Sequence, residues 1–446
     1  MATNEGPAAL SDLRIDGPRL VERLMELGEI GAIPGTDGCA RLALTDDDKA
    51  GRDLVMSWMR ELGLDIAIDG IGNVVATMPL DRLGGEPSSA VPVMTGSHID
   101  TVATGGKYDG NLGVLAGLEV IETVMAAIDG GSLSLPRPLA VAWFTDEEGA
   151  RFPPDMLGSL VYVGGMSLEA ALDIADRDGL TIGDELDRIG YRGGEPIPGP
   201  APHAFVELHI EQGPVLEDAG IGIGAVTGVQ GISWTELTIT GWSAHAGTTP
   251  MHLRRDPGVV AARINLFARE LTERFGGAQV ATCGVVSHTP NLVNVVPSKV
   301  TMTVDLRNTD ESILQQAEAE LFAFVEQVVA DEGCTFEHRS LARFEPVQFD
   351  QRVIELVEST ADSLGHSVQR MPSGAGHDAQ MLARVCPTAM VFTPSVNGIS
   401  HNVTEYTEPD DLAAGADVLL HTMLALASIE FDDGAAAVDE RVEVDA

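Results

Sequence analysis

The run Pro138-Leu-Ala-Val-Ala-Trp-Phe-Thr-Asp-Glu-Glu-Gly149 decides how this chain is organised. Its first seven residues form a short, continuous apolar segment, which is typical of a buried strand in an α/β sheet. Two adjacent carboxylates, Glu147 and Glu148, follow this segment. Open α/β sheets carry their chemistry beyond the carboxyl ends of their strands. One carboxylate could therefore bind a metal while the other transfers a proton, and the alternative is an exposed acidic turn.

Length and composition indicate a soluble globular protein with two domains. The chain has 446 residues, of which 44% are hydrophobic, enough for two substantial cores. We expect no apolar stretch of transmembrane length and find no signal-peptide pattern at the N-terminus, which together favour a cytoplasmic location. The four cysteines are scattered without a CxxC pair. This favours reduced thiols over disulfides or a cysteine-bound zinc.

The charge balance is strongly acidic. The chain has 27 Lys and Arg against 68 Asp and Glu, a formal net charge of −41, and its only lysines are Lys49, Lys107 and Lys299. Such a charge argues against nucleic acid or an anionic membrane as a partner. It suits a protein kept soluble in high salt, where self-repulsion is screened, and a halophilic origin is our hypothesis. An ordinary acidic cytosolic enzyme is the alternative.

The secondary-structure pattern changes at about residue 231. Up to that point, expected strands and helices follow α/β order. From 231 to 342 we expect strand 233–240, helix 256–275, strands 280–287 and 299–307, helix 312–332 and strand 335–340. This β-α-β-β-α-β order is typical of a small α+β domain. We therefore predict a catalytic domain over 1–230 and 343–446, the latter ending in an acidic tail, and an inserted domain over 231–342.

Side chains of the kind that bind metals follow several predicted strands. They are His98 and Asp100, Asp109, Glu147 and Glu148, His209, and His401. Three histidines with two or three carboxylates are enough for two metal ions bridged by one carboxylate. Each histidine alone would more often be a hydrogen-bonded core or loop imidazole. Their joint occurrence at strand ends favours a metallohydrolase.

At these residues the sequence resembles the hydantoinase/carbamoylase family of amidohydrolases. That family includes N-carbamoyl-L-amino acid hydrolases, β-ureidopropionases and allantoate amidohydrolases, within the dinuclear metallo-aminoacylase/exopeptidase superfamily. The similarity covers about residues 20–427, and its motifs are Gly96–Thr101, Gly106–Val114, Glu147–Phe152, Glu207–Glu217, Ala244–Met251, Ser373–Ala379 and Gly398–His401. The most discriminating is Glu207-Leu-His-Ile-Glu211, because His209 stands where the peptidase relatives have a carboxylate ligand.

The resemblance implies a mixed-sheet α/β catalytic domain that holds two divalent metal ions per subunit. Zinc is the first choice, with manganese, cobalt and nickel as alternatives. His98 and His209 would bind one ion, and Glu148 and His401 the other. Asp109 would bridge the two.

The resemblance also implies catalytic roles. Glu147 would be the general base that takes a proton from water and returns it to the leaving nitrogen. Asp100 would orient His98. His245, in the inserted domain, would donate to the developing oxyanion.

Substrate contacts follow from the same motifs. Arg307 would bind a substrate carboxylate bidentately with the help of Asn294, and Gln212 would contact the carbamoyl amide. His377 and Asp378, in a glycine-rich loop, are candidates for substrate contact or for support of a ligand. Without the family, Arg307 could equally be a surface ion-pair partner and Asn294 a turn residue.

We therefore expect a hydrolase that cleaves the ureido C–N bond of N-carbamoyl-L-amino acids to amino acid, ammonia and CO2. Allantoate is the alternative substrate. An aminoacylase or dipeptidase fits less well because of His209, and a non-catalytic binding relative fits poorly because no ligand is lost. The family also implies a homodimer that pairs through the smaller, lid domain.

Overall fold

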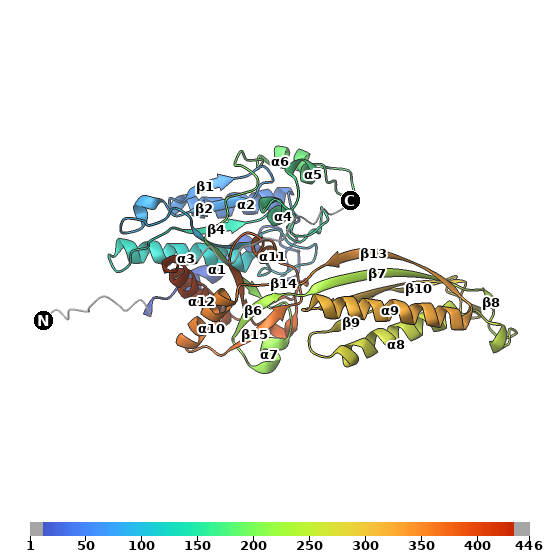
Figure 1. Ribbon diagram of the computed structural model, residues 1–446. Coiled ribbons are helices and arrows are strands. Elements are labelled where there is room, and N and C mark those ends of the chain that lie inside the picture. The colour runs from blue at the N-terminus through green and yellow to red at the C-terminus, as the bar shows by residue number, and fades with distance from the viewer. Residues whose placement is uncertain (1–11, 432–446) are drawn as a thin grey trace. The chain divides into compact units, whose positions relative to one another are not determined.

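The computed structural model describes residues 12–431, which form two compact units (Figure 1). The first unit comprises the chain up to Thr227 and from Phe349 onward, and the second is Gly228–Gln348. The inserted domain expected over 231–342 lies within the second unit. The acidic tail expected beyond residue 431 lies outside the described residues.

A nine-stranded mixed sheet runs through the first unit, and its edge strand β14 (Val347–Gln348) comes from the second unit. Its order is β1-β2-β4-β3-β5-β16-β6-β14, and β15 pairs with β6. The strands are β1 (Asp65–Ile68), β2 (Val74–Thr77), β3 (Val93–Ser97), β4 (Leu139–Trp143), β5 (Ala204–Ile210), β6 (Ile223–Val229), β14 (Val347–Gln348), β15 (Val368–Ser373) and β16 (Thr388–Thr393). Strands β4, β3, β5 and β16 are parallel to one another, whereas β1, β2, β6 and β14 pair antiparallel. The α/β class with a mixed sheet is thus confirmed, and the four parallel strands end at the same edge.

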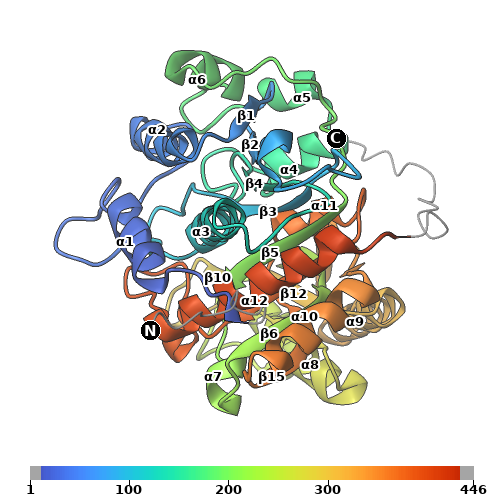
Figure 2. The ribbon, with the colours of Figure 1, turned by 90° about the vertical axis from the view of Figure 1, so that its left-hand side faces the viewer.

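Helix α3 (Asn111–Asp129) packs directly on the parallel strands, and Figure 2 views it end-on beside β3. This helix is almost wholly buried, and accordingly it has apolar residues on all sides instead of along one stripe. A Cβ atom at Gly113 would lie 2.6 Å from the carbonyl oxygen of Leu208, and one at Gly117 would lie 2.6 Å from Thr95 Cγ2. Glycine at these two positions allows the helix to approach the sheet closely. The helix therefore begins right beside the strand ends.

The other helices of the first unit complete its layers. Helix α12 (Pro409–Ser428) packs on β5 and β16, with α1 (Gly17–Gly28) and α10 (Gln351–Ser363) against it. The remaining helices are α2 (Asp46–Glu61), η2 (Leu80–Arg82), α4 (Leu157–Tyr162), α5 (Leu168–Leu172), α6 (Ile182–Ile189), α7 (Val215–Ala219), α11 (Asp378–Leu382) and η4 (Val396–Gly398). Thr45 caps α2, because its hydroxyl accepts the backbone N–H of Asp48 at 3.2 Å.

Two of these helices correct the expectation that no apolar stretch reaches transmembrane length. Within residues 12–431, α3 and α12 are long and apolar enough to cross a membrane, with mean hydropathies of 1.6 and 1.2. However, 78% of the apolar window of α3 and 56% of that of α12 is buried inside the protein. A helix buried in a protein core can be as long and as apolar as a membrane-spanning helix. The burial of α3 and α12 accounts for their apolar composition in this way.

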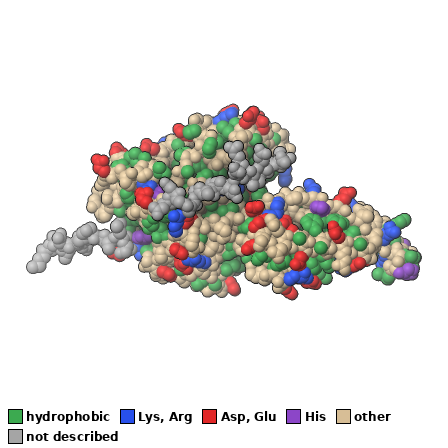
Figure 3. Space-filling view, in the orientation of Figure 1, with side chains coloured by type: hydrophobic (Ala, Val, Ile, Leu, Met, Phe, Trp, Pro, Cys, Tyr) green, Lys and Arg blue, Asp and Glu red, His purple; other side chains and the backbone are tan. Residues whose placement is uncertain are grey.

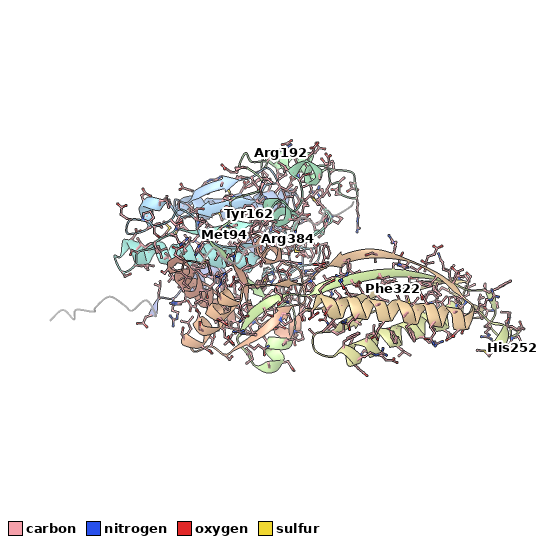
Figure 4. The ribbon with its side chains drawn as sticks, viewed as in Figure 1. Met94, Tyr162, Arg192, His252, Phe322 and Arg384 are labelled. Atoms are coloured by element: carbon pink, nitrogen blue, oxygen red, sulfur yellow. The ribbon has the colours of Figure 1, made fainter. Side chains whose placement is uncertain are left out.

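The second unit is a five-stranded antiparallel sheet with two helices on one face. The sheet order is β10-β12-β7-β13, with β9 also paired to β12. The elements are β7 (Gly231–Thr240), β8 (Ala244–His245), η3 (Met251–Leu253), α8 (Pro257–Phe275), β9 (Val280–Thr282), β10 (Val286–Thr289), β11 (Val295–Val296), β12 (Lys299–Asn308), α9 (Glu311–Glu332) and β13 (Thr335–Phe344). Alternate residues of β7 and β12 are buried against α8 and α9, which lie side by side in Figure 1. In Figure 4, Phe322 marks α9; its ring lies 4.8 Å from that of His338 on β13.

The strand predicted over 280–287 is two strands. Thr282 of β9 lies opposite Asp305, but Val286 of β10 lies opposite Met302, so the register slips by one residue between them. The β9–β10 segment therefore has one residue more than the β12 segment opposite it, which is a β-bulge. The pairing continues there through hydrogen bonds between Val285 and Thr303. The short β8–β11 pair was not predicted, because two-residue strands carry no readable alternation.

Candidate active site

The candidate site forms where the parallel strands end. His98 follows β3, Glu147 and Glu148 follow β4, His209 is the last residue but one of β5, and His401 lies in the loop after β16. Asp109 comes from another direction, in the turn just before α3. The topology therefore brings residues separated by about 300 positions to one point.

Asp109 lies at the centre of this cluster. Its Oδ1 atom is 3.2 Å from His209 Nε2 and 3.6 Å from His98 Nε2, and its Oδ2 atom is 3.5 Å from His401 Nε2. Glu148 Oε2 lies 3.2 Å from the same nitrogen of His401. Two groups of donors thus share Asp109: His98 with His209 on one side, and Glu148 with His401 on the other.

Backbone carbonyls set the tautomers of two histidines. His98 Nδ1 lies 2.8 Å from the carbonyl oxygen of Asp100, and His209 Nδ1 lies 2.8 Å from that of Ile210. Each Nδ1 must carry the proton to donate these bonds, which leaves the Nε2 lone pair directed at Asp109. It is therefore the carbonyl of Asp100 that holds His98. The Asp100 carboxylate instead accepts the backbone N–H of Glu147 at 3.4 Å.

Glu147 is buried beside the cluster, with Oε2 3.4 Å from His98 Nε2. Burial raises the pKa of Glu147 well above its usual range, and the charges of Asp378 and Glu148 add to this effect against that of His98. Asp109 behaves in the opposite way. Burial would raise its pKa, but the adjacent imidazoles of His209 and His98 hold that pKa well below the usual range. A carboxylate that favours its protonated form thus lies beside one that favours its ionised form.

The donor atoms fit divalent cations. His98 Nε2 and Glu148 Oε1 are buried without a hydrogen-bond partner. Buried polar atoms normally have partners, so these two are suited to a ligand of positive charge. Mixed imidazole and carboxylate donors are those that zinc and its first-row neighbours accept.

Gln212 and His377 surround the cluster in different ways. Gln212 adopts a positive φ of 58°, donates from Nε2 to Asp109 Oδ2 at 2.8 Å, and leaves its buried Oε1 without a partner. His377 is fully buried; its ring centroid lies 4.6 Å from that of His209, and its Nε2 is 2.9 Å from Ser373 Oγ. This placement suits His377 to supporting His209, one of the two roles expected for it.

In the second unit, the structure brings together two of the three expected substrate residues. His245 is opposite Val295 in the β8–β11 pair, and the carbonyl of the adjacent Asn294 accepts the backbone N–H of Ala246 at 3.0 Å. Arg307 lies elsewhere, eight residues along β12 from Lys299, or about 26 Å. Lys299, the first residue of β12, follows β11 closely in the chain and lies opposite Thr240, the end of β7 that leads to β8. Hence the pair His245–Asn294 lies beyond the Lys299 end of β12, whereas Arg307 is near the other end of that strand.

Arg307 is held by its neighbours on the open face of the sheet. Its guanidinium donates to both carboxylate oxygens of Asp305 at 3.0–3.2 Å and lies 5.6 Å from the centre of the Trp234 ring. This ion pair resembles the surface role considered as the alternative. A substrate carboxylate could take the place of Asp305 without any change in the geometry of the donors.

Two buried polar groups near the ligands were not predicted from the sequence. Glu207 on β5 accepts the hydroxyl of Ser97 at 2.6 Å and the backbone N–H of Ala379 at 2.8 Å. Glu405 accepts two backbone N–H groups from the turn that carries Asp109. Glu207 shares a predicted strand with His209, two residues away, and that spacing could have found it; Glu405 lies in a loop and has no such signal.

The chain is similar to proteins of a known hydrolase family. The model of peptidase family M20/M25/M40 matches residues 94–425. An N-carbamoyl-L-amino-acid amidohydrolase of Rhizobium meliloti is 42% identical, over 93% of this chain and 98% of the relative. An allantoate amidohydrolase of Escherichia coli is 36% identical, over 91% of this chain and 97% of the relative.

Solved structures give the same result. An amidase of the hydantoinase/carbamoylase family from Burkholderia multivorans has a TM-score of 0.89 at 44% identity, with 94% of this chain and all of that chain covered. The aminopeptidase PepT of Bacillus cereus, at 16% identity, has a TM-score of 0.64 over 93% of this chain and all of that chain, and shares the fold. The expected resemblance is confirmed: the chain belongs to the hydantoinase/carbamoylase amidases within peptidase family M20/M25/M40.

Proposed function

We propose that the protein is a metal-dependent amidohydrolase that cleaves the ureido C–N bond of N-carbamoyl-L-amino acids. One water is consumed, and the products are the amino acid, ammonia and CO2. The observation that carries this proposal is the position of Asp109 between two groups of ligand-type donors, with Glu147 buried beside them. Relatives at 42% and 38% identity that bear the name N-carbamoyl-L-amino acid amidohydrolase support the choice of substrate.

The proposed site holds two divalent cations per subunit, with zinc as the first choice and manganese, cobalt or nickel as alternatives. His98 and His209 would hold one, Glu148 and His401 would hold the other, and Asp109 would be shared by both. When bound, the cations polarise the ureido carbonyl and make water more acidic.

The chain's own groups then move the proton and orient the substrate. Glu147 accepts a proton from the attacking water and returns it to the leaving nitrogen, a role that suits a carboxylate whose pKa is raised. Gln212 accepts an N–H of the ureido group at its unpartnered Oε1. The Asp100 carboxylate accepts the backbone N–H of Glu147 and so holds the turn that carries Glu147.

The second unit provides the groups for the substrate carboxylate and the carbonyl oxygen. Arg307 binds the carboxylate bidentately, and Asn294 assists. His245 donates to the oxyanion: its Nδ1 accepts the N–H groups of Gly247 and Thr248 at 3.0 and 3.3 Å, so its proton is on Nε2. His377 supports His209 from behind.

A homodimer that pairs through the second unit, the proposed lid, completes this assignment. Arg307 is near one end of β12 and the pair His245–Asn294 lies beyond the other, so a single copy of the unit reaches one substrate with one of these groups only. A second copy would supply the other end. In support, the loops around His245 and Asn294 carry exposed apolar side chains, among them Trp242, Leu292 and Val293.

Allantoate is the second candidate substrate, since it also presents a ureido group and a carboxylate. Allantoate amidohydrolases of Escherichia coli and Bacillus subtilis are 36% and 34% identical to this chain. The same residues would serve the same reaction on this substrate.

We also propose adaptation to high salt. The net charge of −41 and the presence of only three lysines support it. In Figure 3, acidic side chains are scattered over the visible face of both units and form no single patch. Dispersed acids of this kind repel one another unless salt screens them.

The test is ammonia release by the metal-loaded protein in high salt, with several N-carbamoyl-L-amino acids compared with allantoate. We expect turnover of the carbamoyl amino acids. A preference for allantoate would keep the mechanism and change the substrate. No turnover of either by protein that holds metal would refute the proposal.

A further inference from the structure

Glu405 is a buried carboxylate that none of the proposed roles uses. It lies in the loop between β16 and α12, with 4% of its surface exposed. Its Oε1 atom accepts the backbone N–H of Tyr108 at 3.2 Å and that of Asp109 at 3.1 Å. A carboxylate that accepts two consecutive backbone N–H groups fixes the peptide planes of that turn. Glu405 therefore holds the main chain from which the Asp109 side chain projects.

A second contact reaches the Asp109 side chain through a hydroxyl. Ser400 Oγ lies 3.1 Å from Glu405 Oε2 and 2.9 Å from Asp109 Oδ2. Gln212 Nε2 donates to the same oxygen of Asp109 at 2.8 Å. The Ser400 hydroxyl has one proton, shared between these two carboxylates; when it is donated to Asp109, Oδ2 has two donors and the plane of the carboxylate is fixed, with Oδ1 directed at His98 and His209.

The turn and Glu405 are also pressed together. A Cβ atom at Gly106 would lie 2.3 Å from Glu405 Oε1 and 2.4 Å from Glu405 Cβ. Only glycine leaves room for this approach. The contact thus involves the main chain of the turn, the carboxylate of Asp109 and the packing of Gly106, although residues 109 and 405 are 296 positions apart.

We propose that Glu405, acting through Ser400 and through the backbone of the turn, is a positioning residue that fixes Asp109 between the two cation positions. This inference rests on the proposed function, because it takes Asp109 to be the shared ligand. Partners behind a ligand typically contribute 10- to 100-fold to metal affinity. Glu405 touches neither substrate nor cation, so its effect should appear in metal binding and kcat and leave KM nearly unchanged.

The experiment is a zinc titration of metal-free protein against a chromophoric competitor, for the wild type, Glu405→Ala, Glu405→Gln and Ser400→Ala. We expect Glu405→Ala to weaken zinc binding about 10- to 100-fold. Ser400→Ala should weaken zinc binding less, by about fivefold, because it removes a single hydrogen bond. Glu405→Gln should stay within about threefold of the wild type, since its amide oxygen accepts both N–H groups and its NH2 donates to Ser400.

Glu119 provides a matched control. It is also a buried carboxylate that accepts a backbone N–H, from Asp16 at 3.1 Å, but it lies on α3 away from the ligands. Glu119→Gln should lower the unfolding temperature and leave zinc affinity unchanged. If Glu119→Gln and Glu405→Ala lose equal zinc affinity, the effect of Glu405 is a general loss of stability, and the positioning role is refuted.

The outcomes separate this inference from the proposed function. Wild-type protein that binds no zinc would refute the proposed metal site itself. Wild-type protein that binds zinc, with Glu405→Ala of equal affinity, would refute the positioning role alone. If Glu405→Ala yields no folded protein, Ser400→Ala decides: a loss of zinc affinity at an unchanged unfolding temperature supports the role, and an unchanged affinity overturns it.

Discussion

Removal of the metal should destabilise the protein by an amount that the site geometry sets. Glu147 Oε2 and Asp109 Oδ1 both lie near His98 Nε2, at 3.4 and 3.6 Å, so they are at most about 7 Å apart. Glu148 Oε2 and Asp109 Oδ2 are likewise at most about 7 Å apart, through His401. At an effective dielectric constant of about 20, each pair repels by about 2.4 kcal/mol when both of its carboxylates are ionised. Cations between them remove about 5 kcal/mol of repulsion.

That energy converts to a measurable temperature. A ligand present at about a thousand times its Kd stabilises the folded state by about 4 kcal/mol, which is close to the repulsion that the cations remove. With an unfolding entropy of about 2.1 cal/mol/K per residue over the roughly 300 described residues of the first unit, 4 kcal/mol corresponds to about 6 °C. We therefore expect a chelator to lower the unfolding temperature by about 6 °C.

The assay is calorimetry in high salt with and without chelator, and elemental analysis confirms removal of the metal. Asp109→Asn is the control, because it lacks the shared ligand and should not respond to the chelator. An unfolding temperature that changes by less than ~1 °C on verified metal removal would show that the buried carboxylates need no cation.

Four further predictions follow from named groups. Glu147→Gln should keep its metal and lose about 10²- to 10⁴-fold in kcat, and residual kcat near the wild-type value would remove Glu147 as the base. Arg307→Ala should raise KM for carboxylate substrates about 10- to 100-fold with unchanged metal content, whereas unchanged kinetics would place Arg307 outside the site. Burial raises the pKa of every thiol, to about 11 for Cys283 and Cys334 and about 12 for Cys386, so Ellman's reagent at pH 8 should react slowly with the folded chain and quickly once it is unfolded. Dilution from molar salt to ~0.1 M should unfold the protein, and a constant unfolding temperature would favour an ordinary acidic enzyme.

The sequence predicted the central strands and the ligand-type residues because local patterns encode both. An apolar run such as 138–144 predicts a buried strand by itself, and a parallel sheet brings the residues that follow such strands to one edge. His98, Glu147 and Glu148 could therefore be placed together before any coordinates. The bulge between β9 and β10 could not be predicted from the sequence, because a one-residue slip leaves the alternation of side chains on either side of it intact.

Contacts that depend on tertiary geometry were predicted less well. The sequence places Asp100 two residues from His98, but whether its carbonyl or its carboxylate meets the imidazole depends on backbone dihedrals that spacing does not specify. Glu405 shows the same limit more sharply. Its partner, the turn of Asp109, is remote in sequence, and an isolated glutamate in an acidic chain carries no signal that it is buried.

The acids of this protein fall into two physical classes. Those dispersed over the surface are hydrated, and mobile salt screens their mutual repulsion within a Debye length of about 3 Å at 1 M. Asp109 and Glu147 are buried, so mobile salt screens them much less than a cation bound beside them would. Salt and metal should therefore stabilise the protein independently. The chelator's effect on the unfolding temperature should persist in molar salt, where the surface contribution is already saturated.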